Sequence, residues 1–391
     1  MRFTHFSDSH IGSWRDEKMS QLGTLAFKQA LEESISKQVD FVLIAGDLFN
    51  TALPPIDKLK EVVIELKKLH GKNIPCYVIP GSHDFSASGK TMIDVLEHAG
   101  LLINVCKGSV ENDTLKLKLT EDKRTGAKIT GIIGKKGMLD RKYYEKLDRD
   151  SLENEKGFKI FMFHTAITEL KPKELEKMDS APLSLLPKGF DYYAGGHVHI
   201  VDKKDIDGYK NVIYPGALFP NSFREIEEQK HGGYFLYDNG TIEYHPVQLK
   251  NVVVITINCD NKTTDEVQKE VLQQVKDASV KDAIVTVRLQ GTLHSGKISD
   301  IPLQEIIGML YHKGAYFVMR STSLLRTKDV EIIHTTASSV EEAENAVIAE
   351  NKQDADQIKR LMLILSLEKM EGETKYNYEK RIIEETNKLL E

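Results

Sequence analysis

The chain carries five short polar clusters rich in aspartate and histidine, the side chains that hold divalent metal ions in proteins. Carboxylates and imidazoles without thiolates suit borderline ions such as Mn, Fe, Co or Zn. Two such ions, about 3.5–4 Å apart, also need a carboxylate that bridges them, and Asp47 is the candidate for that role. The clusters are Asp8-Ser-His10, Gly46-Asp47, Gly81-Ser-His83-Asp84, His164 and Gly195-Gly-His197-Val-His199.

Each cluster lies just past a run of apolar residues that predicts a β-strand, and the runs occupy residues 2–7, 41–45, 76–79, 158–163 and 191–194. In an open α/β fold the carboxyl ends of strands converge on one edge, so we expect the five clusters to form a single pocket. Residues two apart in extended chain point to the same side, which holds for Asp8 with His10 and for His197 with His199.

The alternation of strand and helix signals divides the chain into three sections. Residues 1–246 predict an α/β domain, with a helix over 56–69 that follows two prolines and ends at Gly71. Residues 247–334 predict a small α/β module with strands at 252–257, 283–289 and 315–320 and helices at 265–275 and 302–310. Residues 335–391 show no strand signal, and the capping-box spacing at 339–342 together with Gly372 predicts a helical arm.

Composition limits the class of protein. The 391 residues are 40% hydrophobic and 29% charged, typical of a folded globular chain. Fifty-three basic against 59 acidic residues give a net charge of −6, which excludes a protein that binds nucleic acid by electrostatic wrapping alone. Three scattered cysteines favour a reducing compartment. No signal peptide or membrane-spanning stretch is visible, so we expect a cytoplasmic protein with no membrane contact.

The five clusters, in this order, resemble the motifs D-x-H, G-D, G-N-H-D/E, H and G-H-x-H of the calcineurin-like metallophosphoesterase superfamily. The resemblance implies an α/β fold of two packed sheets flanked by helices, with two divalent ions. It implies that one ion is held by Asp8, His10, Asp47 and His199, and the other by Asp47, His164 and His197.

The resemblance also assigns roles to the cluster at residues 81–84. The superfamily has an asparagine ligand of the second ion where this chain has Ser82. A serine hydroxyl is shorter and reaches the ion only through water, so the second ion is expected to be weakly held. His83 is expected to face the phosphate, with Asp84 orienting its imidazole, while a water held by the ions attacks.

A narrower resemblance rests on residues 3–12, 45–50 and 214–216. These stretches look like the double-strand-break repair nuclease whose bacterial form is SbcD, the meiotic-recombination-eleven family. That family implies an Mn²⁺-dependent DNA endonuclease and exonuclease. Asn50 stands where many members carry a histidine implicated in exonuclease action, so exonuclease strength is expected to be reduced.

The same family implies two protein partners. Its members form homodimers through helices of the nuclease domain, and apolar stripes at 56–69 and 92–96 are candidates, although core packing explains each stripe equally well. Its C-terminal helices dock on an SMC-like ABC ATPase of the SbcC or Rad-fifty class. The candidate docking residues are Leu361, Leu365, Tyr378 and Ile382, unless this stripe packs back on its own domain.

Three parts of the chain are candidates for contact with DNA. The family assigns the middle module, residues 247–334, to holding DNA. By position, Trp14 and Arg15 are candidates to touch DNA beside the site. Lysines close to the clusters could contact the phosphate backbone: Lys135, Lys136, Lys203 and Lys204.

Two other functions stay open from the sequence. The chain could hydrolyse small phosphoesters, since the metal motifs of such enzymes look nearly identical, but these enzymes would not need the C-terminal residues. Alternatively, Ser82 and Asn50 could mark a weakly catalytic, metal-bound scaffold for the ATPase.

Overall fold

The computed structural model describes residues 1–86, 91–135, 137, 139–171, 175–206, 208–328, 355–367, 369–370 and 375–390. These residues form two compact units, Met1–Leu325 and Arg326–Glu391. The predicted boundary at 334/335, the capping box at 339–342 and Gly372 lie outside the described residues. The predicted division into three functional sections therefore stays a prediction.

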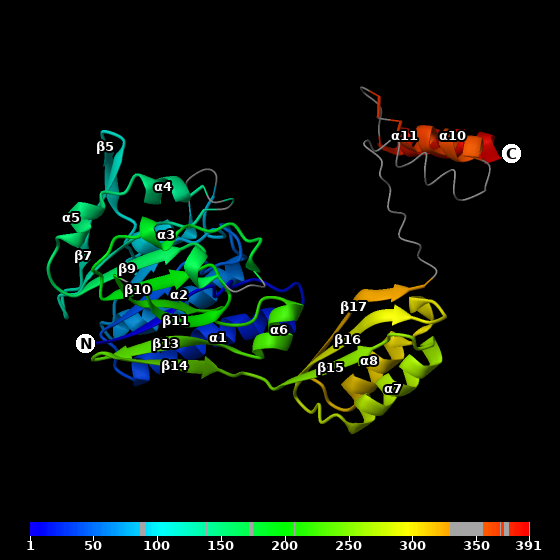
Figure 1. The fold of residues 1–391 in the computed structure, drawn as a ribbon, viewed down its shortest axis with the longest axis horizontal. Coiled ribbons are helices and arrows are strands. Elements are labelled where there is room, and N and C mark those ends of the chain that lie inside the picture. The colour runs from blue at the N-terminus through cyan, green and yellow to red at the C-terminus, as the bar shows by residue number, and fades with distance from the viewer. Residues whose placement is uncertain are drawn as a thin grey trace. The chain divides into compact units, whose positions relative to one another are not determined.

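The first sheet carries three of the five polar clusters (Figure 1). Its three central strands run parallel, so their carboxyl ends lie at one edge. They are almost entirely buried, which is why they are continuous apolar runs in the sequence. The strand order is β14 (Thr241–Val247), β13 (Gly232–Asp238), β1 (Arg2–Phe6), β2 (Phe41–Ala45), β3 (Cys76–Ile79) and β4 (Ile103–Asn104).

The second sheet carries the remaining two clusters, at the ends of two neighbouring parallel strands, β9 and β10. Between the two sheets lies a core to which both contribute aromatic rings, such as Phe3 and Tyr192, which meet edge to face. The strand order is β11 (Val201–Ile206), β12 (Tyr209–Pro215), β10 (Tyr192–Gly196), β9 (Lys159–His164), β8 (Lys128–Gly131) and β7 (Thr120–Glu121).

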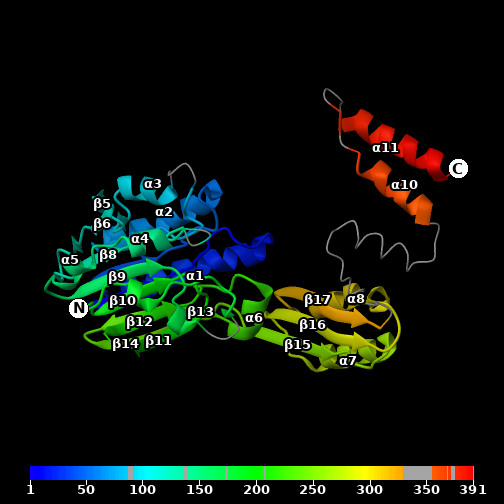
Figure 2. The ribbon, with the colours of Figure 1, turned by 45° about the horizontal axis from the view of Figure 1, so that its top comes forward.

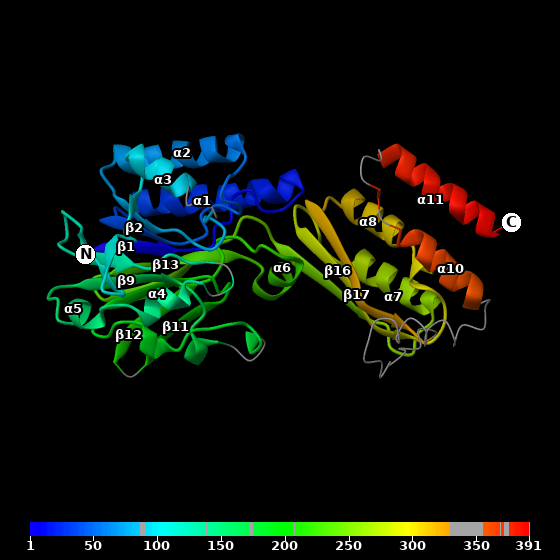
Figure 3. The same cartoon turned by 90° about the horizontal axis from the view of Figure 1, so that it is seen from above.

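Helices cover the outer faces of this pair of sheets (Figure 3). The first sheet is covered by α1 (Glu17–Ser36), α2 (Ile56–Gly71) and α3 (Met92–His98). The second is flanked by the short helices α4 (Arg141–Glu145) and α5 (Arg149–Glu153) and by the hairpin of β5 (Gly108–Glu111) and β6 (Thr114–Leu117). The predicted arrangement of two packed sheets flanked by helices is confirmed.

The predicted helix over 56–69 is present as α2, and its stripe divides between core and surface. Val62, Leu66 and Leu69 are buried in the core with the first sheet. Ile56 is 84% exposed, and Ile64 is exposed as well. Most of the stripe is therefore core, and a smaller apolar surface of α2 is exposed.

The predicted small α/β module follows directly in the chain (Figure 2). Its three strands, β15 (Val252–Asn258), β16 (Ile284–Leu293) and β17 (Phe317–Thr327), form one sheet in that order. The helices α7 (Thr264–Asp277) and α8 (Leu303–His312) pack on it around their own core, which includes Val267, Val271 and Ile306. The strand and helix predictions for this module are confirmed.

The second compact unit contains a pair of helices, α10 (Ala355–Leu365) and α11 (Lys375–Leu390), which contact each other. The Tyr378 hydroxyl donates a hydrogen bond to the Leu367 carbonyl. Within the described residues, no helix is both long and apolar enough to cross a membrane. Cys76, Cys106 and Cys259 are all free thiols.

Candidate metal centre

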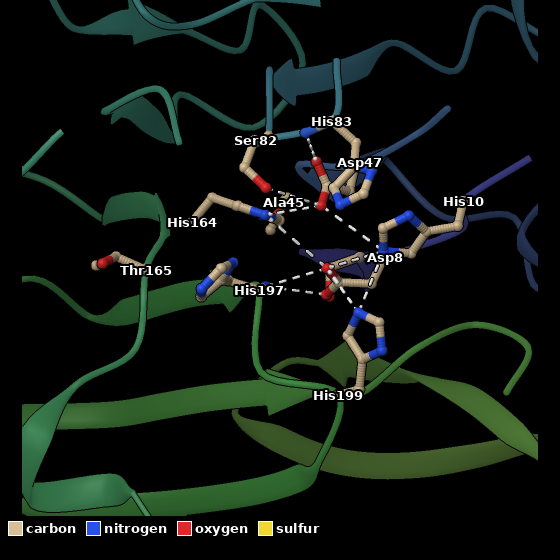
Figure 4. Close-up of polar contacts among 12 residues, drawn as sticks. Asp8, His10, Ala45, Asp47, Ser82, His83, His164, Thr165, His197 and His199 are labelled. Carbon is tan, nitrogen blue, oxygen red and sulfur yellow. Dashed lines mark hydrogen bonds and ion pairs between the residues drawn. The ribbon is translucent and has the colours of Figure 1, made fainter. Parts of the chain in front are cut away.

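The clusters from five strand ends meet in one place between the two sheets (Figure 4). Asp8 and His10 follow β1, Asp47 follows β2, and His164 ends β9. Ligand atoms within 4.8 Å of one another form three groups, which are Asp8–His10–His199, His10–Asp47–His83 and Asp8–Asp47–His164. The expectation that these strand ends share a pocket is confirmed: Asp8, His10 and Asp47 each belong to two of the three groups, whereas His197 belongs to none of them.

The side chains of the centre converge closely, and some of them hydrogen-bond one another in the absence of an ion. The Asp47 Oδ2 atom lies 3.2 Å from His164 Nε2 and 3.6 Å from His10 Nε2. The His199 Nε2 atom lies 3.6 Å from Asp8 Oδ1 and 3.1 Å from His10 Nε2. His197 contacts the centre through its backbone, since its main-chain N–H donates to both Asp8 carboxylate oxygens. The centre of its ring lies 5.2 Å from the centre of the His164 ring.

The backbone at the clusters adopts conformations that side chains usually avoid. Asp8, His10, Asp47 and His197 have φ of 50°, 41°, 50° and 88°, in the left-handed region. Such strain persists only where the surrounding structure enforces it, and it concentrates at functional sites. Gly46 has φ +90°, and a Cβ there would lie 2.2 Å from His164 Nδ1, so this position requires glycine.

Main-chain and carboxylate acceptors fix the tautomers of two candidate ligand histidines. The Ala45 carbonyl accepts a hydrogen bond from His164 Nδ1, 2.8 Å away. The Glu225 carboxylate accepts one from His199 Nδ1, 3.1 Å away. Because these acceptors require a proton on Nδ1, the Nε2 lone pairs of both rings point into the centre in the neutral state.

In the centre, the lone pair of a buried imidazole nitrogen therefore faces a carboxylate oxygen, which also lacks a proton to donate. A cation between the two atoms would interact favourably with both. His164 Nε2 is buried and lacks a well-oriented hydrogen-bond partner although Asp47 Oδ2 lies 3.2 Å away. Without an ion, a proton substitutes: burial lowers the pKa of His164, but Asp47 outweighs it and raises that pKa to about 9. The residues present thus fit divalent metal ions.

The two carboxylates of the centre are held in the charged form. Burial alone raises the pKa of Asp8, but the His199 hydrogen bond and the charge of His164 lower it to about 2. The pKa of Asp47 is also lowered, because His164 and His10 outweigh its burial. By contrast, burial and the neighbouring His164 lower the pKa of His197 to about 4, so this ring is neutral and able to coordinate.

His83 is half-buried at the edge of the centre, on the loop after β3. Its main-chain N–H donates to Asp47 Oδ1 at 2.7 Å, and its Nδ1 hydrogen-bonds the Asn50 carbonyl at 2.8 Å. Nδ1 must carry the proton in that bond, so in the neutral ring Nε2 is the nitrogen with a lone pair. The ring lies 4.8 Å from that of His10, centre to centre.

The prediction that Asp84 orients the His83 ring is wrong. Its carboxylate accepts main-chain N–H groups of Leu48, Phe49 and Gly81 at 3.1, 2.9 and 3.0 Å, so it joins the loops after β2 and β3. The ring is oriented instead by the Asn50 carbonyl. Burial and the charge of Asp47 raise the pKa of Asp84 to about 7, although the hydrogen bonds from the three main-chain N–H groups lower it in part.

Ser82, the departure from the family pattern, lies in the centre. Its side chain is almost fully buried, and its Oγ is 3.5 Å from Asp47 Oδ2. Figure 4 shows Ser82 between His83 and His164, on the side where an asparagine ligand is expected.

The predicted DNA contacts lie outside the centre. Trp14 is half-buried against the core and donates its indole N–H to the Pro220 carbonyl at 3.1 Å, while Arg15 is exposed. Lys135 lies over the rings of Phe85 and Tyr143. Of the other candidate lysines, Lys203 is exposed on β11, Lys204 pairs with Asp202 at 2.9 Å, and Lys136 lies outside the described residues.

A cavity of about 580 Å³ opens beside the centre. His197 and His199 form one wall, and apolar side chains of Leu175, Met178 and Ile200 form another. The third wall is the helix α6 (Phe223–Gln229), which contributes Glu225 and Gln229. Sequence reasoning missed both α6 residues, and the capping spacing of Ser222 and Glu225 was the only available signal.

Comparisons with known proteins agree with this geometry. The calcineurin-like phosphoesterase family matches residues 1–201, which include every candidate metal ligand. Three archaeal relatives bear the name DNA double-strand break repair protein Mre11. The relative from Archaeoglobus fulgidus is 24% identical over 316 residues, which cover 75% of this chain and 69% of the relative. For Methanococcus maripaludis the identity is 28%, covering 68% and 71%, and for Sulfurisphaera tokodaii it is 29%, covering 86% and 85%.

Proposed function

Because the chain belongs to the calcineurin-like phosphoesterase family, we propose that it is a metal-dependent DNA nuclease that processes ends in double-strand-break repair. One observation carries the proposal: aspartates and histidines from separate strand ends converge in three overlapping groups of ligand atoms. Asp47, the candidate for a carboxylate shared by two ions, belongs to two of these groups, as do Asp8 and His10. The named relatives supply the DNA substrate, and their similarity extends well beyond the phosphoesterase domain, over up to 86% of this chain.

The ligands divide into two sets that share Asp47. We assign Asp8, His10, Asp47 and His199 to one ion, and Asp47, His164 and His197 to the other, with Ser82 contributing through water. Nitrogen and carboxylate ligands together are compatible with Mn²⁺, which we take as the ion. When bound, two such ions supply Lewis-acid activation of water and of the phosphate.

The chain's own residues supply the remaining chemistry. The Asn50 carbonyl holds His83 Nδ1, so the ring is fixed at the edge of the centre, where its doubly protonated form could give the Nε2 proton to a leaving oxygen. Asp84 holds the two loops that carry Asp47 and His83. Asn50 offers its carbonyl to His83, but its side chain cannot act as the family's histidine, so we expect endonuclease cleavage to exceed exonuclease cleavage.

The C-terminal helices are proposed to bind an SMC-like ABC ATPase of the SbcC or Rad-fifty class. Leu361, Tyr378 and Ile382 are half-buried, whereas Leu365 is 58% exposed. Leu363 and Ile383 are also exposed, so the pair of helices keeps apolar surface for a partner. A pull-down with the ATPase tests this, and a chain truncated before Ser339 should lose binding.

A homodimer and a cytoplasmic location complete the proposal. Ile56 and Ile64 on α2 and Val95 on α3 are exposed apolar residues of the first unit, and they could be covered by a second copy of this chain. Sedimentation of the full-length chain tests the dimer. Substituting Ile56 and Val95 with lysine should yield monomers.

The decisive experiment compares substrates with Mn²⁺ present. Linear, hairpin and circular single-stranded DNA are incubated with the chain, with and without the ATPase, beside a chromogenic phosphomonoester. DNA cleavage that His83→Ala abolishes supports the nuclease. Turnover of the phosphomonoester alone would identify a small-molecule phosphoesterase, and metal binding without either activity would identify a scaffold.

A further inference from the structure

Helix α6 holds the metal ligand His199 by two side chains on successive turns. The Glu225 carboxylate accepts from His199 Nδ1 at 3.1 Å, and the Gln229 amide donates to the His199 main-chain carbonyl. Residues four apart lie on the same face of a helix, so one face of α6 fixes both the ring and the backbone of His199.

Glu225 itself has little freedom. Its second oxygen accepts the Asn221 main-chain N–H at 2.8 Å, and the Ser222 hydroxyl donates to the first at 3.1 Å. Ser222 also caps α6 by accepting the Glu225 main-chain N–H. The carboxylate is therefore fixed to the first turn of α6, and any shift of this helix moves it relative to His199.

The small α/β module holds the same helix by a different residue. Arg288 on β16 donates to Glu227 Oε2 through Nε at 2.9 Å and through Nη2 at 2.6 Å. Its guanidinium also lies 4.9 Å from the centre of the Phe223 ring. The side chains of Arg288 and Glu227 are only 16% and 11% exposed, so removing either one leaves a largely buried charge without its partner.

We infer that α6 is a positioning helix that couples the α/β module to the metal centre: Arg288 fixes α6, and Glu225 and Gln229 on α6 fix His199. The inference rests on His199 being a metal ligand, as proposed above. It makes the orientation of one ligand depend on a module that contributes no ligand. A displacement of the module, for example when it engages a substrate, would then change how tightly the ion is held.

The test measures Mn²⁺ affinity of the full-length chain by titration calorimetry, without any substrate. Glu225→Gln should weaken binding about tenfold or more, as is usual when the carboxylate partner of a ligand histidine is lost. Arg288→Met should weaken it by about threefold or more, within the range of coupling through packed elements. The matched control is Glu228→Gln, which removes from the same helix and the same cavity a carboxylate that pairs with Arg224. It measures the effect of lost charge alone and should weaken affinity much less than Glu225→Gln does.

The sign of the Arg288→Met effect separates coupling from simple electrostatics. Removing a positive charge near a cation site should strengthen Mn²⁺ binding if charge alone matters. Coupling predicts weaker binding, and it predicts no further loss from Arg288→Met in a Glu225→Gln/Gln229→Ala background. Unchanged or tighter binding by folded Arg288→Met, or an equal loss in that background, would overturn the inference.

A charge-exchange variant and a folding control accompany these titrations. Exchanging the pair, Arg288→Glu with Glu227→Arg, should restore most of the affinity that Arg288→Met loses, and failure of the folded exchange variant to do so counts against the coupling. Calorimetry without metal verifies that each variant is folded. If the wild type binds Mn²⁺ but cleaves no DNA, the proposed nuclease fails while the coupling stands.

Discussion

Because Asp84 joins two loops, the structure predicts that its loss reduces stability. The sequence alone leads to the opposite expectation. If Asp84 only oriented the His83 ring, its loss would reduce activity and spare stability. In the structure its carboxylate, which is 1% exposed, is the acceptor for three main-chain N–H groups from two loops. We therefore expect Asp84→Ala to destabilise the first domain strongly.

The magnitude follows from the donors left behind. A buried donor without an acceptor costs about 1–3 kcal/mol, so three of them cost about 3–9 kcal/mol. A water molecule that enters the space vacated by the carboxylate recovers part of this, and we expect about 4 kcal/mol. For a domain of this size that amounts to a fall in Tm of about 12 °C. Asp84→Asn keeps one acceptor oxygen and should cost about half as much.

The assay is calorimetry of the full-length, metal-free chain, together with Mn²⁺-dependent DNA cleavage. Asp84→Ala should lose both Tm and activity. The control is His83→Ala on the same loop, which removes no acceptor for the buried amides and should lose activity while keeping its Tm. If Asp84→Ala keeps the wild-type Tm and loses only activity, Asp84 orients the His83 ring after all and its role in joining the two loops is refuted.

Three other perturbations test the centre. Ser82→Asn should raise DNA cleavage at low Mn²⁺, because a carboxamide can reach the second ion directly, and an unchanged metal titration curve would count against it. Gly46→Ala should lower the Tm and weaken Mn²⁺ binding, since its Cβ would lie 2.2 Å from His164 Nδ1, and a wild-type Tm would contradict this. Removing metal with EDTA should abolish cleavage and lower the Tm; an ion at 100 times its Kd stabilises by about 2.7 kcal/mol. Readding Mn²⁺ should reverse both effects, and no change in Tm would argue against a bound ion.

Buried elements were predictable from the sequence because they carry unbroken apolar runs. All five residues of β2 are buried, and the run at 41–45 marks its bounds correctly. Strand β11 at the sheet edge is mostly exposed and reads Val-Asp-Lys-Lys-Asp-Ile, which resembles a polar loop. No prediction covered it, because its strand conformation comes from pairing with β12 rather than from its own residues.

The site shows the same division between local and tertiary information. Asp8, Asp47 and His164 were found because they follow strands, and strand ends converge. The partners that orient ligands were not found, because they come from elements whose contact depends on the whole fold. Glu225 lies 26 residues beyond His199 and reads as an ordinary capping residue. Asp84 lies next to His83 in sequence, but its carboxylate accepts three main-chain N–H groups, and the His83 ring bonds the Asn50 carbonyl instead.

The electrostatics of the centre explain why a chain of net charge −6 can serve as a nuclease. Without ions, the raised pKa values of His164 and His199 supply two protons that neutralise Asp8 and Asp47. Ligation requires these imidazoles to be neutral, so two divalent ions would replace two protons and leave about two positive charges at the ligand set. This local charge lies where a phosphate must bind and is little opposed by acidic residues beyond a Debye length of about 8 Å. The net charge of the chain therefore predicts little about phosphate binding, whereas the ligand set predicts its position.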